Sequence, residues 1–286
     1  MFFTILAIGF LATSCDKNND GMANTSELTL NLSGLDALGD DFVYEGWIIV
    51  NGSPVSTGTF SSVAFPQSFT VDADELANAT KFVLSIEPAV DSDPAPADTK
   101  ILAGDFSGDL ANVSSNGIVA DFSASSGKYI LATPTNGSDN DELSGVWFLD
   151  ITSGTPAVGL DLPVLPNGWK YEGWSVIDGI PVSSGTFTDV DDFDDNATTT
   201  TFKGDLGDGP AFPGEDYLQN APSGLTFPTD LRGATIVISV EPYPDNSSAP
   251  FTLKPIAHLV PSDAADHVTI AMGRGPVVSL SGDVMR

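Results

Sequence analysis

The side chains best suited to chemistry lie in an acidic run, DVDDFDDN, at residues 189–196. Carboxylate oxygens are the ligands that calcium prefers in proteins. Part of the run has the spacing of an EF-hand loop, but Ala197 stands where that loop requires glycine and Lys203 where it requires glutamate. An irregular calcium site and a solvated acidic loop, in which like charges repel each other, both remain as interpretations. The candidate calcium ligands are Asp189, Asp191, Asp192, Asp194 and Asp195.

Other reactive side chains do not form a recognisable catalytic set. Glu45 and Glu172 recur at equivalent places, but a glycosidase needs two carboxylates in one site, and these lie about a domain length apart. His258 and His267 are the only histidines, and nothing in their spacing favours zinc. The chain contains no G-x-S-x-G, P-loop or H-E-x-x-H motif. We therefore expect a non-enzymatic protein without a cofactor, calcium being the one open exception.

The chain is organised around a stretch that occurs twice. Residues 44–60 read YEGWIIVNGSPVSTGTF and residues 171–187 read YEGWSVIDGIPVSSGTF, with 11 of 17 positions identical and no gap. Each copy predicts a β-hairpin, because alternating side chains lead into Asn-Gly or Asp-Gly, the dipeptides that tight turns favour. Pro54 and Pro181 stand near the start of the return strand, where a missing N–H is tolerated.

A second block is also shared between the repeats. KFVLSIEP at residues 81–88 corresponds to TIVISVEP at residues 235–242, and each reads as a half-buried strand that ends at Glu-Pro. Trp47 and Trp174 are expected to be core anchors, with a sugar-binding platform as the alternative. The residues expected to have a structural role in the repeated motif are Glu45, Trp47, Pro54, Glu87, Glu172, Trp174, Pro181 and Glu241.

This pattern resembles the extracytoplasmic C-terminal domain of anti-sigma-K factors. The resemblance rests on the strand carrying Trp47, the G-x-PVS-x-GTF hairpin and Glu87-Pro88, together with their counterparts in the second repeat. It implies a small β-sandwich-like domain. It does not carry over the regulatory activity, because no segment of this sequence matches the family's sigma-binding region or membrane-spanning helix.

Composition agrees with an all-β protein. The 286 residues include 28 Gly and 20 Pro, and helical periodicity is missing except for a short candidate helix at residues 72–79. The net charge of −29 excludes nucleic acid as a partner, since affinity for phosphates comes from Lys and Arg. The same charge favours solubility.

The start of the chain predicts where in the cell the protein is located. Residues 2–12 are an apolar run that is too short to cross a bilayer, and Thr-Ser-Cys follows directly. With Ala12, these residues resemble a bacterial lipoprotein processing box. Cys15 is the only cysteine, and we expect it to carry the lipid that anchors the protein to a membrane of the cell envelope. The folded part would then face the periplasm or the cell surface.

These observations predict two tandem β-sandwich-like domains after a signal peptide and a flexible tether. The expected boundaries are a signal peptide at 1–14, a lipidated tether at 15–25, repeat one at 26–136, a linker at 137–144 and repeat two at 145–286. Repeat two has an acidic insertion at 188–234, which is the expected contact surface. The function expected is that of a binding or structural lipoprotein with a protein or glycan partner. Its alternatives are a sensing component related to anti-sigma regulation and a carbohydrate-binding surface protein.

Overall fold

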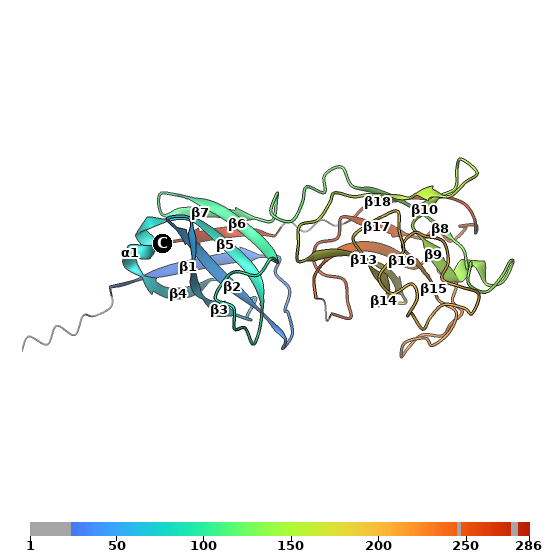
Figure 1. Cartoon of the computed structure of the whole chain (residues 1–286), viewed down its shortest axis with the longest axis horizontal. Coiled ribbons are helices and arrows are strands. Elements are labelled where there is room, and N and C mark those ends of the chain that lie inside the picture. Colours follow the sequence, from blue (N-terminus) through green and yellow to red (C-terminus); the bar gives the residue numbers. More distant parts are fainter. Residues whose placement is uncertain (1–23, 245–246, 276–279) are drawn as a thin grey trace, which may run out of the picture.

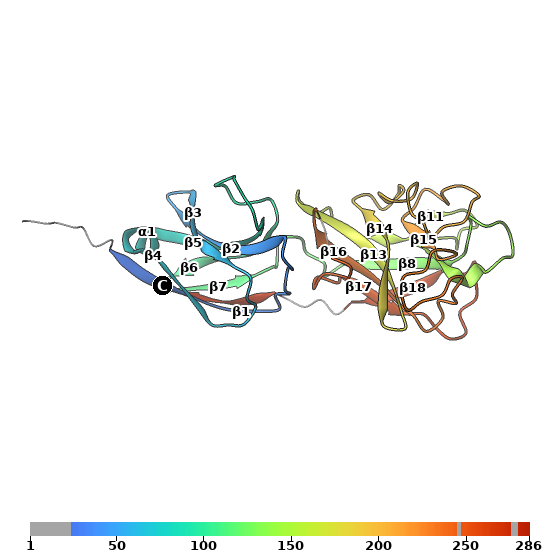
Figure 2. The same ribbon diagram turned by 90° about the horizontal axis from the view of Figure 1, so that it is seen from below.

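The computed structural model describes residues 24–244, 247–275 and 280–286. It confirms the all-β class: two nearly closed sheets lie next to each other along the long axis of the molecule (Figures 1 and 2). The expected signal peptide, Cys15 and most of the tether lie outside the described residues. Within the described ranges no helix is long and apolar enough to cross a membrane.

The first sheet has the strand order β3-β2-β5-β6-β7-β19-β1-β4. Its one helix, α1 (Ala73–Asn78), confirms the short helix predicted there, and the side chain of Asp72 caps it by accepting from the backbone N–H groups of Asp74 and Glu75. The strands are β1 (Thr25–Ser33), β2 (Phe42–Val50), β3 (Ser53–Phe60), β4 (Gln67–Asp72), β5 (Ala79–Pro88), β6 (Lys100–Ser107), β7 (Leu110–Ser114) and β19 (Ser281–Met285).

The second sheet repeats this order as β14-β13-β16-β17-β18-β8-β9-β15. A short strand, β12 (Leu160–Asp161), pairs with β8, while β10 (Leu149–Asp150) and β11 (Ala157–Val158) pair with each other. The 3-10 turn η1 (Glu142–Ser144) precedes β9. The main strands are β8 (Ser126–Leu131), β9 (Gly145–Trp147), β13 (Trp169–Ile177), β14 (Ile180–Phe187), β15 (Gly214–Asp216), β16 (Thr235–Pro242), β17 (Ile256–Leu259) and β18 (Ile270–Arg274).

The repeated stretch forms the predicted hairpin in both sheets, as β2–β3 and β13–β14. Asn51-Gly52 and Asp178-Gly179 form the turns, and all four residues have positive φ, as a type I′ turn requires. Each hairpin also contains a bulge after the glycine of the EGW motif. A Cβ atom at Gly46 would lie 2.4 Å from Thr57 Oγ1, so this close strand approach requires glycine.

The strand pairing differs from the expected division at 137–144. Strand β8 falls within the expected repeat one but lies in the second sheet, between β18 and β9. Strand β19 ends the expected repeat two but lies in the first sheet, between β7 and β1; in Figure 1 the C-terminus accordingly lies with the blue and cyan strands. Strands β7 and β8, and likewise β18 and β19, are therefore consecutive in the chain but lie in different sheets.

The interior of the two sheets is continuous. Tyr44 and Phe82 in the first sheet belong to the same buried apolar cluster as Phe148 and Tyr171 in the second. Gly168, in the loop before β13, packs directly against the backbone of Asp98 and Thr99. The two sheets are thus joined by packing as well as by the crossing strands.

Candidate functional site

Residues that the first repeat shares with the second form a buried hydrogen-bond relay. Trp47 is 3% exposed, and its Nε1 donates to Ser85 Oγ at 2.8 Å. Ser85 donates in turn to Glu87 Oε1, which also accepts from the backbone N–H of Ala97 at 2.8 Å. The relay connects β2, β5 and the loop after Glu87-Pro88.

The second repeat contains the same relay. Trp174, which is 2% exposed, donates to Ser239 Oγ at 2.8 Å, Ser239 donates to Glu241 Oε1, and the Phe251 N–H donates to that oxygen at 2.8 Å. The glutamate of the Glu-Pro motif therefore fixes the following loop in both repeats. Since both indoles are buried, neither offers the flat exposed face that a sugar platform requires.

The other motif residues also have local structural roles. Glu45 accepts from Ser56 Oγ, and Glu172 accepts from Ser183 Oγ, so each carboxylate binds the return strand of its own hairpin. Pro54 and Pro181 lie on β3 and β14, the terminal strands of the two sheet orders, where a missing N–H costs no ladder bond. The two glutamates consequently do not share a site.

Removing the central hydroxyl of one relay should destabilise the protein. For Ser239→Ala we expect a loss of roughly 2 kcal/mol in the free energy of unfolding, because Trp174 and Glu241 both lose a buried partner. The midpoint of urea unfolding measures this loss. The exposed Ser61 provides the control, since Ser61→Ala should change the midpoint little. Equal midpoints for the two variants would contradict a stabilising relay.

The five aspartates of the acidic run are not brought to a common centre. Asp189, Asp191 and Asp192 are exposed, and Asp195 binds Lys170 Nζ at 2.7 Å and Thr186. Asp194 is 5% exposed and accepts from the backbone N–H groups of Gly214 and Asn196, each at 3.2 Å. Among the described residues no group of three or more His, Cys, Asp or Glu side chains could hold a metal ion. Calcium binding by the run stays a prediction.

The insertion instead packs against the second sheet. The rings of Phe202, Tyr217 and Phe227 contact one another, with centroids 5.5 to 6.2 Å apart. Between the aromatic residues, Gly214–Asp216 forms strand β15 against β9. The insertion therefore supplies the terminal strand of the second sheet.

Strand β15 buries two carboxyl groups that sequence reasoning did not single out. Glu215 is 2% exposed and accepts from Thr200 Oγ1 and from the Asp216 N–H. Asp216 accepts from Trp147 Nε1 at 2.7 Å and from the Thr135 N–H at 2.9 Å. Burial raises the pKa of Asp216. The one sequence signal that could have indicated their burial is Tyr217, a large aromatic residue directly after the acidic pair.

Burial also raises the pKa of Glu215, to about 8, and that of Asp194, to about 6. Hydrogen bonds to each carboxylate act in the opposite direction and are outweighed. The negative charges of Asp194 and Asp216 add to the increase at Glu215. The buried carboxyl groups of Glu215, Asp194 and Asp216 therefore make the stability of the protein depend on pH.

The two histidines lie in different surroundings. His258 Nδ1 lies 3.0 Å from the hydroxyl of Tyr129, and burial lowers the pKa of the imidazole. His267 is exposed and lies 3.2 Å from Asp266 and 3.8 Å from Glu142. Because the two histidines have different partners, and no group of three or more metal-ligating side chains occurs within the described ranges, the described residues give zinc no support.

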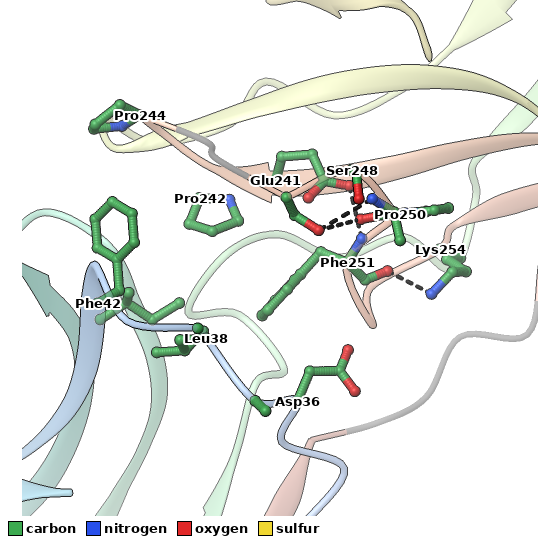
Figure 3. Close-up of a pocket in the computed structure, with 15 residues that line it drawn as sticks. Asp36, Leu38, Phe42, Glu241, Pro242, Pro244, Ser248, Pro250, Phe251 and Lys254 are labelled. Atoms are coloured by element: carbon green, nitrogen blue, oxygen red, sulfur yellow. Dashed lines mark hydrogen bonds between the residues drawn. The ribbon is translucent and has the colours of Figure 1, made fainter. Parts of the chain in front are cut away.

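A cleft of about 650 Å³ lies between the two sheets (Figure 3). The first sheet contributes the loop between β1 and β2, with Asp36, Leu38 and the start of β2 at Phe42. The second sheet contributes Glu241 and Pro242 at the end of β16, together with Pro244, Ser248 and Lys254 of the following loop. The relay glutamate Glu241 thus shapes one wall through its bond to Phe251.

The cleft combines apolar walls with a few charges. Lys254 Nζ donates to the carbonyl of Phe251 at 2.6 Å, and burial lowers the pKa of Lys254, while the charges of Asp36 and Glu241 raise it. The described lining residues include no His or Cys. Such a site can bind a ligand or a protein segment.

Comparison with known proteins gives a match for the first repeat. Neither a curated protein nor a solved structure matches the chain. A family model does match: that of the family described as Anti-sigma-K factor rskA, C-terminal, over residues 21–101. These residues span β1 to the beginning of β6 and contain the hairpin and the relay. The first repeat is therefore similar to the C-terminal domain of anti-sigma-K factors, as its motif predicted.

Proposed function

We propose that the chain is a non-enzymatic sensing and binding protein of the cell envelope, related to the extracytoplasmic part of anti-sigma systems. The family match over residues 21–101 is the observation that carries this proposal. The repeated motif residues are occupied in holding the fold together, so they are not available as a catalytic set. Binding then falls to the cleft between the sheets, where Lys254 and Phe42 line an apolar space.

A genetic comparison in the native host tests this proposal. Deleting the gene should change transcription from promoters of an alternative sigma factor, and the unaltered gene should restore it. Lys254→Gln, which removes the half-buried charge of the cleft, should restore it only in part. Lys81→Gln removes a charge on the outer surface and provides the matched control.

Two results would contradict the proposal. If deletion leaves every sigma-dependent promoter unchanged, the chain has no part in such regulation. If Lys254→Gln and Lys81→Gln restore transcription equally, the cleft is not the binding site. Both variants should accumulate to the level of the wild-type protein, which immunoblotting checks.

Membrane attachment is a separate part of the proposal. Cys15→Ser should prevent lipidation, because the modified group is the thiol of this single cysteine. We expect the wild-type protein to enter the detergent phase on Triton X-114 partitioning and the variant to stay in the aqueous phase. Equal partitioning of both would exclude Cys15 as the anchor.

A further inference from the structure

Two strands of the molecule have changed places. In the chain β8 directly follows β7, yet β8 lies in the second sheet, and β19 directly follows β18, yet β19 lies in the first. Each nevertheless fills the same position in the strand order of its sheet, next to β7 and β1 in one case and next to β18 and β9 in the other. The duplication has thus produced an exchange of strands inside one chain.

The two strands also correspond in sequence. Strand β8 begins Ser126-Gly127-Lys128-Tyr129, and β19 begins Ser281-Gly282-Asp283-Val284. The charged third residue is exposed in both, and the fourth, Tyr129 or Val284, is fully buried. Corresponding elements that complete each other's domain are the elements that domain swapping exchanges between molecules.

Strand β19 is held by its neighbours on both sides. Its residues pair with five residues of β1 and with five of β7, so the ladder is complete on both edges. Arg286, which follows it, donates to the carbonyls of Leu76 and Ala79 at 2.9 and 2.8 Å and lies over the ring of Phe106. All these contacts are made with the first sheet, to which β19 is joined in sequence only through the second.

We propose that the space between β7 and β1 is a strand-acceptor site, and that its partner in trans is β19 of a second copy of this chain. The contacts above are the same whichever copy supplies the strand. Within one molecule the covalent connection to β18 keeps β19 at a high effective concentration, so the closed monomer prevails in dilute solution. Exchange between copies occurs when chains fold together at a concentration that competes with this intramolecular connection.

Cysteine cross-linking tests this exchange, because Asn112 on β7 lies directly opposite Asp283 on β19 and both are exposed. Residues 16–286 lack Cys15, so an introduced cysteine is the only thiol. A chain with Asn112→Cys and a chain with Asp283→Cys, one of which carries a tag that changes its size, are unfolded together. The mixture is then refolded at about 10 µM or at about 1 mM. These concentrations lie on either side of the effective concentration that a short covalent connection gives. Oxidation and a non-reducing gel then report the mixed dimer.

We expect the mixed dimer to form after refolding at the higher concentration, at least about fivefold above the lower one. Ser61→Cys, at an exposed position away from both strands, replaces Asn112→Cys in the control and measures random collision. A chain with both Asn112→Cys and Asp283→Cys should form the bond internally at the lower concentration. A mixed dimer no more abundant than the Ser61→Cys control would overturn the proposal, and so would a doubly substituted chain that stays reduced.

Discussion

Deleting residues 281–286 should unfold the first sheet and leave the second sheet folded. The expected loss in the free energy of unfolding of the first sheet is about 5 kcal/mol or more, which is the whole stability of many domains. The deleted segment contains the fully buried Val284 and the ladder partners of both β1 and β7. It also contains Arg286, whose guanidinium satisfies carbonyls at the end of α1.

Hydrogen exchange read by mass spectrometry distinguishes the two sheets. Protection should be lost in β2 and β5 and retained in β13 and β16, although the deleted residues are joined in sequence to the second repeat. Arg286→Ala should weaken the first sheet to a smaller extent, and replacing the exposed Asp283 by Ser should have little effect. Loss of protection in β13 and β16 instead would show that β19 completes the second sheet.

The hairpins and the buried tryptophans show what a sequence can predict. Asn51-Gly52 and Asp178-Gly179 specify tight turns through backbone conformations that few other residues adopt, so local chemistry was sufficient. The burial of Trp47 and Trp174 was expected because large aromatic side chains commonly anchor a core. Both features follow from residue type and local chemistry, and this is why they could be predicted.

The exchanged strands show where such prediction ends. Alternating residues identify β8 and β19 as strands, but alternation does not say which strands are their neighbours. The linker at 137–144 has the turn-forming composition of a boundary, whereas the sheets divide according to pairing partners. The cleft was hidden for the same reason, because it joins the loop at Asp36 to the loop at Lys254.

The buried carboxyl groups illustrate a different limit. The acidic insertion predicts repulsion between solvated side chains, and Asp189 and Asp191 are indeed exposed. Glu215 and Asp194 are buried because the aromatic residues of the insertion pack against the second sheet. The neighbouring segments of the chain are thereby also held against that sheet. Tertiary packing therefore decides which carboxylates are buried and which are exposed, and composition alone does not distinguish them.

Replacing Glu215 by glutamine should remove much of the pH dependence of stability. The pKa of Glu215 rises from 4.5 to about 8 on folding, so between these pH values the folded state holds a proton that the unfolded state has released. The free energy of unfolding must then fall as pH rises through this range, by up to about 1.4 kcal/mol per pH unit. Asp194, whose pKa rises to about 6, adds a fall of the same sign at lower pH.

Urea unfolding at about pH 5 and about pH 8, the lower and upper parts of the range set by Glu215, measures this dependence. The free energy of unfolding of Glu215→Gln should equal that of the wild type at the lower pH. At the higher pH it should be larger than that of the wild type by about 2 kcal/mol or more, since the neutral amide has no proton to lose. Glu27→Gln, at an exposed position, should follow the wild type at both. If Glu215→Gln loses as much stability with rising pH as Glu27→Gln does, the buried carboxyl is not the titrating group, and general repulsion among the 39 acidic residues is responsible.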